Sequence, residues 1–297
     1  MFHLVLATML QDAAVPAAIG TFTDIYSANV SLLRKPQRGI RHSFFYISHL
    51  YLCQDPLARK LVAGEDNLLH AGANVDYMTR RALIGDELVL SGHVNGTRQV
   101  VSLGAGMDSR AFRLGLSDTT FFEVDKQALF DVKEPLVAEN ALQASSRHLV
   151  VGTIGQMDLP AALRAAGHDS ARPTTWLMEG LAPYLTVAIM HELAKDVGAL
   201  SAPGSSLWLD GFSQTSVEKG MYFHGVKFES GLDNYDELWL SNGFDFSQQV
   251  DMTGVYLDGA QKIQVDPRYI VTATQTRGHN MCLMARATKS APRCPAH

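Results

Sequence analysis

The stretch from residue 100 to residue 114 constrains the fold of this chain more than any other. A short apolar run, 100–103, leads directly into Gly104-Ala105-Gly106. An apolar run ahead of paired glycines is typical of a buried parallel strand that ends in a tight turn. Glycine accepts positive φ and lets a ligand approach the backbone closely, and Asp108 and Ser109 suit a helix start. The stretch therefore predicts the first strand–turn–helix unit of a doubly wound sheet, in which nucleotide-like ligands bind outside the strand ends.

Strand-like and helix-like runs alternate after this turn, which predicts an α/β fold with a mostly parallel sheet and right-handed crossovers. The further strands are expected at 121–125, 148–152, 174–180 and 206–210, separated by helices such as 126–140 and 187–200. Two last strand-like runs, 269–276 and 280–287, predict an antiparallel hairpin.

Three regions follow from this pattern. Residues 1–95 are expected to form a helical region that covers the ligand crevice, and 96–288 the α/β core. Within the core, the aromatic-rich range 211–267 breaks the alternation and is interpreted as a cap insertion near the substrate. Residues 289–297, which contain two prolines, are interpreted as a flexible tail.

Composition excludes several classes of protein. The formal net charge of −5 argues against nucleic-acid binding, which needs a basic surface. Three cysteines and eleven histidines show no metal-ligand spacing, so no metal site is expected. No apolar run approaches the roughly 20 residues that span a bilayer, and we expect a cytoplasmic protein without a membrane partner, either monomeric or homodimeric.

Three carboxylates fall at the predicted strand ends. Glu123 and Asp125 share one face of the second strand, and Asp125, as the terminal residue, is better placed to accept hydrogen bonds from a ribose diol; a solvated acid is the alternative. Glu179 follows the apolar fourth strand, so its carboxylate needs a cation. That cation is either a ligand, an arginine such as Arg80, or the partner in a purely structural ion pair.

Together, the motifs LGAGMDSRAFRL (103–114), FFEVD (121–125) and TTWLMEGLAPYL (174–185) resemble the leucine carboxyl methyltransferase family. The resemblance extends over residues 55 to 210 and includes the segment 76–80. It implies a Rossmann-like class I methyltransferase fold with a seven-stranded sheet, the cofactor S-adenosylmethionine, and methyl transfer to a carboxylate oxygen.

The resemblance also implies roles for individual residues. Arg80 matches the arginine that meets the methionine carboxylate, and Asp125 matches the ribose acid. The complete set of cofactor-binding residues expected here is Arg80, Gly104, Ala105, Gly106, Glu123, Asp125, Thr153, Ile154, Glu179 and Gly180. After the third strand the family usually carries Asp-Leu, which meets the adenine. Here Thr153-Ile154 fill that place, or a loop shift brings in Asp158.

The acceptor is less constrained. The aromatic cap and helical region fit a small hydrophobic or polyketide-like carboxylic acid; a phenol or a protein C-terminal carboxylate is the alternative. A carboxylate is already ionised at neutral pH and needs no general base, whereas a phenol would need one, for which His224 and Tyr184 are the candidates. Two other classes stay open. A nicotinamide-dependent oxidoreductase is disfavoured because Ser109 replaces the last glycine of the dinucleotide fingerprint; the other is an inactive binding scaffold.

Overall fold

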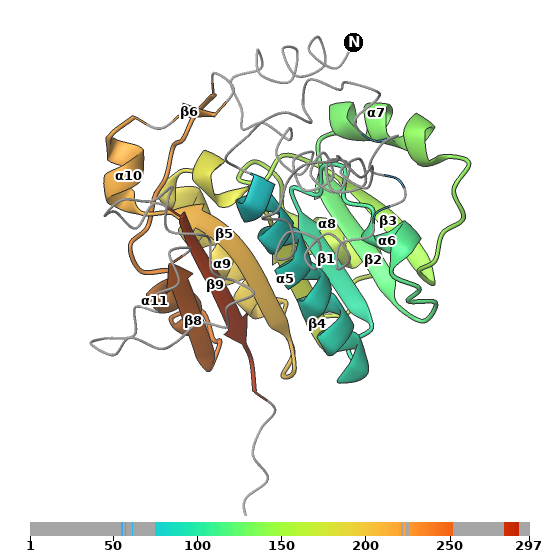
Figure 1. Ribbon diagram of the computed structural model, residues 1–297. Coiled ribbons are helices and arrows are strands. Elements are labelled where there is room, and N and C mark those ends of the chain that lie inside the picture. Colours follow the sequence, from blue (N-terminus) through green and yellow to red (C-terminus); the bar gives the residue numbers. More distant parts are fainter. Residues whose placement is uncertain are drawn as a thin grey trace, which may run out of the picture.

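Seven strands form one mixed sheet in the computed structural model (Figure 1), which describes residues 75–220, 222–223, 226–251 and 282–290 together with Asp55, Leu57 and Leu61. The strands of this sheet are β1 (Gln99–Leu103), β2 (Thr120–Asp125), β3 (Ser146–Val151), β4 (Thr174–Met178), β5 (Ser206–Phe212), β8 (Phe246–Asp251) and β9 (Cys282–Thr288). Their order is β3-β2-β1-β4-β5-β9-β8. The five strands β3, β2, β1, β4 and β5 run parallel to one another. Strand β9 is antiparallel to β5, and β8 is antiparallel to β9. A separate small sheet pairs β6 (Tyr222–Phe223) with β7 (Val226–Lys227).

Helices cover both faces of the large sheet. They are α5 (Val75–Val94), α6 (Arg110–Arg113), α7 (Gln127–Val137), α8 (Leu159–Ala165), the 3-10 helix η4 (Ala182–Tyr184), α9 (Val187–Ala199), α10 (Gln214–Glu218) and α11 (Tyr235–Leu240). In Figure 1, α5 crosses the front of the sheet, and α8 and α9 lie behind it. None of these described helices is long and apolar enough to cross a membrane.

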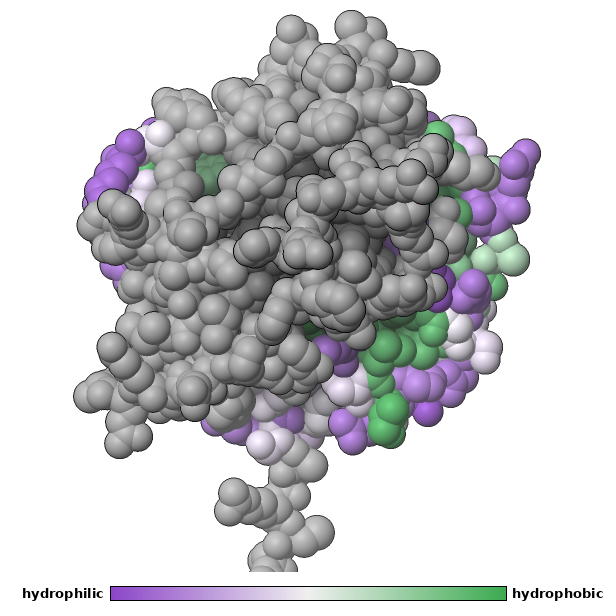
Figure 2. Space-filling model, viewed as in Figure 1, coloured by the Kyte–Doolittle hydropathy of each residue, from purple (hydrophilic) through white to green (hydrophobic). Residues whose placement is uncertain are grey.

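Two apolar clusters fill the space between the sheet and its helices. Because side chains alternate along a strand, Val100 faces the cluster that includes residues of α5, α6 and α7, whereas Val101 and Leu103 face the cluster that includes residues of α8, α9 and α11. All five residues of β1 are buried, as expected for a central parallel strand. Leu90 and Val94, near the C-terminal end of α5, have exposed apolar side chains, and Figure 2 shows a small apolar patch at the lower right of this face.

The predicted α/β fold, with a mostly parallel sheet and an antiparallel last strand, is confirmed. The structure differs from the prediction in the range assigned to the cap. Residues 246–251 pair with β9 as the sheet strand β8, and Tyr235 and Trp239 of α11 are buried in the core. In the described residues β9 therefore pairs antiparallel with both β5 and β8, and the predicted strand 269–276 lies outside them.

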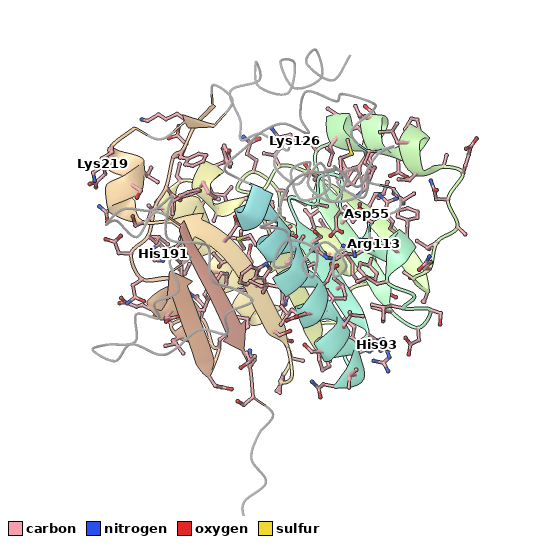
Figure 3. The ribbon with its side chains drawn as sticks, in the orientation of Figure 1. Asp55, His93, Arg113, Lys126, His191 and Lys219 are labelled. Atoms are coloured by element: carbon pink, nitrogen blue, oxygen red, sulfur yellow. The ribbon has the colours of Figure 1, made fainter. Side chains whose placement is uncertain are left out.

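Strand order reverses at β1, whose neighbours are β2 on one side and β4 on the other. The crevice outside the carboxyl ends of the strands at such a switch point is where ligands bind in open α/β sheets. Figure 3 labels Lys126 just beyond the carboxyl end of β2, and His93 at the opposite edge of the sheet. The glycine turn 104–106, Asp125 and Glu179 lie at this same end of the strands, after β1, at the end of β2 and after β4.

Candidate functional site

The turn after β1 is tied to the end of β2. The backbone amides of Gly104 and Ala105 both donate to the carbonyl of Val124, at 2.9 and 3.1 Å. Gly104 has φ +65°, and a Cβ there would lie 3.1 Å from Cδ1 of Leu181, tighter than an ordinary contact. Glycine is therefore required at 104 both for its conformation and for the close approach of the segment after β4.

Asp125 closes this turn from the end of β2. Its Oδ2 accepts from the amide of Gly106 and its Oδ1 from the amide of Lys126, each at 2.8 Å. The side chain is buried, and burial raises the pKa of Asp125 to about 7, although the two amides and the charges of Lys133 and Lys126 favour the carboxylate. A carboxylate has about four lone-pair sites, so Asp125 can still accept from the two hydroxyls of a sugar diol.

Glu123 has a different role from Asp125, although both lie on one face of β2. Its carboxylate accepts from Nζ of Lys133 at 2.6 Å and from Nε and Nη2 of Arg147, each at 2.7 Å. Lys133 belongs to α7 and is completely buried. The structure therefore uses Glu123 to join α7 and β3 to β2, and of the two predicted acids only Asp125 faces the glycine turn.

Glu179, directly after β4, is held by Arg110. Its Oε2 accepts from Nη1 of Arg110 at 2.9 Å and its Oε1 from Nη2 at 3.0 Å, and Nε1 of Trp208 also donates to Oε1 at 3.2 Å. The cation that the sequence requires here is thus an arginine from α6. Arg80, the arginine named in that prediction, lies within α5, and its side chain is outside the described structure.

Arg110 was not among the predicted site residues. It links three carboxylates, those of Asp86, Asp108 and Glu179, and its side chain is 1% exposed. The sequence contains one indication of this role: Arg110 precedes Ala111 and Phe112 at the start of an apolar helix, and an arginine that is buried there must be paired with an acid. The sequence does not reveal which of the chain's acids would be its partners.

A second arginine extends the same ionic cluster. Arg113 donates from Nη1 and Nη2 to the two carboxylate oxygens of Asp86, at 2.6 and 2.7 Å. Its Nε donates to Oγ of Ser109 at 3.0 Å, and that hydroxyl in turn donates to Asp55. Figure 3 shows Asp55 and Arg113 together beside α6. Ser109, which replaces the fingerprint glycine, therefore connects α6 to the segment at Asp55.

The loop after β3 lies beside the end of β2. The amide of Gly152 donates to the carbonyl of Asp125 at 2.9 Å, so Thr153 and Ile154 follow directly beside the end of β2. Asp158 is exposed and caps α8, accepting from the amide of Ala161 at 2.9 Å. In this conformation Asp158 serves the helix, and Thr153-Ile154 occupy the place next to Asp125.

The segment after β4 carries Gly180 and Tyr184. The amide of Gly180, which has φ +69°, donates to the buried carboxylate of Asp210 at the end of β5. The Tyr184 ring packs edge-on against Phe228 with centroids 5.1 Å apart, and Phe228 packs against Phe212 at 4.8 Å. These three rings form an aromatic cluster at the end of β5, in which Tyr184 and Phe228 are buried. His224, the other candidate base, lies outside the described residues.

The sequence profile of the Leucine carboxyl methyltransferase family matches residues 49–198, just over half of the chain. A protein of Mycobacteroides abscessus named "Putative S-adenosyl-L-methionine-dependent methyltransferase" is 42% identical over 139 residues, or 46% of this chain and 45% of the relative. A relative in Mycolicibacterium smegmatis with the same name is 34% identical over 207 residues, 67% of this chain and 64% of the relative. The chain thus spans about half the length of the first curated relatives, 45% and 54%.

Solved structures with a similar arrangement are more distant in sequence. A putative methyltransferase from Thermobifida fusca has a TM-score of 0.48 and 14% identity, covering 80% of this chain and 90% of that chain. The N-methyltransferase NodS from Bradyrhizobium japonicum, in complex with S-adenosyl-L-homocysteine, has a TM-score of 0.47 and 12% identity, covering 79% and 97%.

Proposed function

This chain belongs to the leucine carboxyl methyltransferase family, and we propose that it is an S-adenosylmethionine-dependent O-methyltransferase. The observation that carries the proposal is the position of Asp125. Its buried carboxylate stands at the switch point of the sheet and is bonded to the amide of Gly106 in the glycine turn. This arrangement fits the ribose of the cofactor, because the carboxylate accepts from a diol and the glycines let the nucleoside approach.

The other contacts to the cofactor follow from their places around the turn. Thr153 and Ile154 line the adenine, next to Asp125. The glycine turn, Gly104 to Gly106, passes beneath the sugar. Glu179, directly after β4, lies next to the amino-acid tail. Arg80 on α5 completes the set as the partner of the tail carboxylate. When bound, the cofactor would supply a methyl group on a sulfonium sulfur; an acceptor oxygen would bond to the methyl carbon while the carbon–sulfur bond breaks and the sulfur leaves as a neutral thioether.

We propose the carboxylate of a small hydrophobic acid, including polyketide-like acids, as the acceptor. The aromatic cluster of Tyr184, Phe212 and Phe228 supports an apolar acceptor, because it makes the region beyond β4 and β5 apolar and aromatic rings bury a large area. A carboxylate is ionised at neutral pH, so the protein has only to align its oxygen with the methyl group. Alignment of this kind supplies effective molarities on the order of 10⁵–10⁸ M.

Titration calorimetry with S-adenosylhomocysteine tests the cofactor. We expect the native chain to bind it, Asp125→Asn to bind at least about tenfold more weakly after losing a charge-assisted acceptor, and Asp131→Asn to bind like the native chain. Asp131 is the matched control because it is exposed on α7 nearby and accepts only a side-chain bond from Gln127. Binding of NADH in place of S-adenosylhomocysteine would overturn the proposal.

A methyl-transfer screen with labelled cofactor tests the acceptor. It compares small hydrophobic carboxylic acids with phenols and with a peptide that ends in leucine. Transfer to the acids, with base-labile ester products, is the expected result. Transfer to phenols alone would replace the carboxylate by a hydroxyl acceptor, and transfer to the peptide alone would identify a protein C-terminus.

A further inference from the structure

We propose that Arg110 is a positioning residue for the amino-acid end of the cofactor. It holds Glu179, Asp108 and α5 in one fixed arrangement, and so acts on the affinity for the tail much more than on that for the nucleoside. The inference rests on the proposed function, since the tail contacts belong to that site.

Arg110 has a partner for each of its five N–H donors. Nε donates to Oδ1 of Asp86 at 2.7 Å, and Nη1 donates to Oδ2 of Asp108 at 3.0 Å and to Oε2 of Glu179 at 2.9 Å. Nη2 donates to Oε1 of Glu179 at 3.0 Å and to the carbonyl of Ala82 at 3.3 Å. A planar guanidinium with every donor engaged has one possible orientation, and a lysine ammonium with three donors cannot reproduce it.

These partners come from the three segments that would surround the tail. Asp108 follows the glycine turn by two residues, Glu179 follows β4, and Ala82 lies two residues after Arg80 on α5. Arg110 therefore fixes the distances between the segments as well as the orientation of one carboxylate.

The charges of this cluster stabilise one another. Burial alone would raise the pKa of Asp86, but Arg113 and Arg110 outweigh it and hold that pKa below its ordinary value. Burial acts in the same way on the pKa of Asp108, and Arg110 and then Lys133 lower it. Both acids thus stay ionised near neutral pH, and the cluster keeps its geometry there.

A glycine allows α5 to approach this pair. A Cβ at Gly85 would overlap Oε1 of Glu179 and meet Nη2 of Arg110. Further along the same helix, a Cβ at Gly92 would instead meet Oγ1 of Thr175. The chain therefore offers two tightly packed glycine positions on one helix: Gly85 lies against the Arg110–Glu179 pair, and Gly92 lies against Thr175 of β4.

The nucleoside contacts are separate from this cluster. Asp125 is bonded to the amides of Gly106 and Lys126, and Thr153-Ile154 follow β3, so no described bond of Arg110 reaches them. A change at Arg110 should consequently weaken a ligand that has the amino-acid tail and spare one that lacks it. General destabilisation of the fold would weaken both ligands together.

The test compares the Kd of S-adenosylhomocysteine with that of 5′-methylthioadenosine, which has the same nucleoside but no amino-acid tail. For Arg110→Lys we expect S-adenosylhomocysteine to bind at least tenfold more weakly and 5′-methylthioadenosine to stay within about threefold of native. Arg147→Lys is the control, because Arg147 is also a buried arginine paired with carboxylates but lies on β3. Its ratio of the two Kd values should remain native.

Gly85→Ala and Gly92→Ala form a second pair of variants. Gly85→Ala should shift the ratio in the same direction as Arg110→Lys, and Gly92→Ala should leave it unchanged; this pair decides the matter if Arg110→Lys does not fold. An unchanged ratio in Arg110→Lys or in Gly85→Ala, or equal losses for the two ligands, would overturn the positioning role. If the native chain bound neither ligand, the proposed function itself would fail instead.

Discussion

Asp125 accepts hydrogen bonds best as a carboxylate, yet burial raises its pKa to about 7, against the opposing influence of two backbone amides, Lys133 and Lys126. If Asp125 accepts from the ribose as we propose, the cofactor binds best to the molecules in which Asp125 is ionised. We expect the affinity for S-adenosylhomocysteine to fall about tenfold from pH 8 to pH 6, because only about a tenth of the molecules carry the charge at pH 6. Calorimetry at the two pH values measures this.

Asp125→Asn provides the control for that pH dependence. The amide cannot ionise, so its affinity should be low at both pH values and nearly independent of pH. An equal affinity of the native chain at pH 6 and pH 8 would contradict the prediction.

At the residue scale, local sequence located the site but not its partners. The position of Asp125 at a strand end could be predicted because strand ends are marked by apolar runs and glycines. The division of labour between Asp125 and Glu123 could not, since it depends on Lys133 and Arg147, which reach Glu123 only in the folded sheet. Arg110 was missed for the same reason, because its acids come from three separate segments.

At the scale of elements, the start of α8 separates two interpretations of the adenine wall. Asp158 caps α8 through the amide of Ala161. We expect Asp158→Ala to lower the free energy of unfolding by about 1 kcal/mol through the lost cap and to leave the Kd of 5′-methylthioadenosine unchanged. Urea unfolding and calorimetry measure the two quantities. A clear loss of nucleoside affinity would instead place Asp158 at the adenine.

The elements themselves were predictable where their signals are local. The predicted strands 121–125 and 206–210 correspond to β2 (Thr120–Asp125) and β5 (Ser206–Phe212), since each is a short run with turn residues on both sides. Strand β8 was not predicted, because its sequence, FSQQVD, is largely polar and its partner β9 begins 31 residues after the end of β8. Pairing across such a separation is decided by tertiary structure rather than by local propensity.

At the scale of the whole molecule, two buried titrating groups, His168 and Asp125, make stability depend on pH in opposite directions. His168 lies at the amino ends of the parallel strands and Asp125 at their carboxyl ends. His168, ahead of β4, is buried between Phe122 and Trp176 and contacts Oγ1 of Thr174 at 2.9 Å. Burial lowers the pKa of His168 to about 4, and Asp169 only partly opposes this. Between pH 4 and 6.5 the unfolded chain takes up a proton at this histidine that the folded chain does not, so stability rises with pH. Asp125, with its pKa raised from 3.8 to about 7, keeps a proton that the unfolded chain loses, so stability falls over the same range.

In the native chain the two contributions to the pH dependence of the free energy of unfolding should nearly cancel. Each should appear by itself in a variant that lacks the other group. With no ligand present, Asp125→Asn removes the falling contribution, so its free energy of unfolding should rise, relative to the native chain, by about 2 kcal/mol from pH 4.5 to pH 6.5. His168→Phe keeps an aromatic ring in place and removes the rising contribution, so its free energy of unfolding should fall by a similar amount relative to the native chain. Urea unfolding at both pH values measures the changes, which should add in the double variant because the two groups share no partner. Parallel pH profiles for the native chain and both variants would show that neither buried group titrates with the shifted pKa, and would also remove the basis for the pH-dependent cofactor affinity.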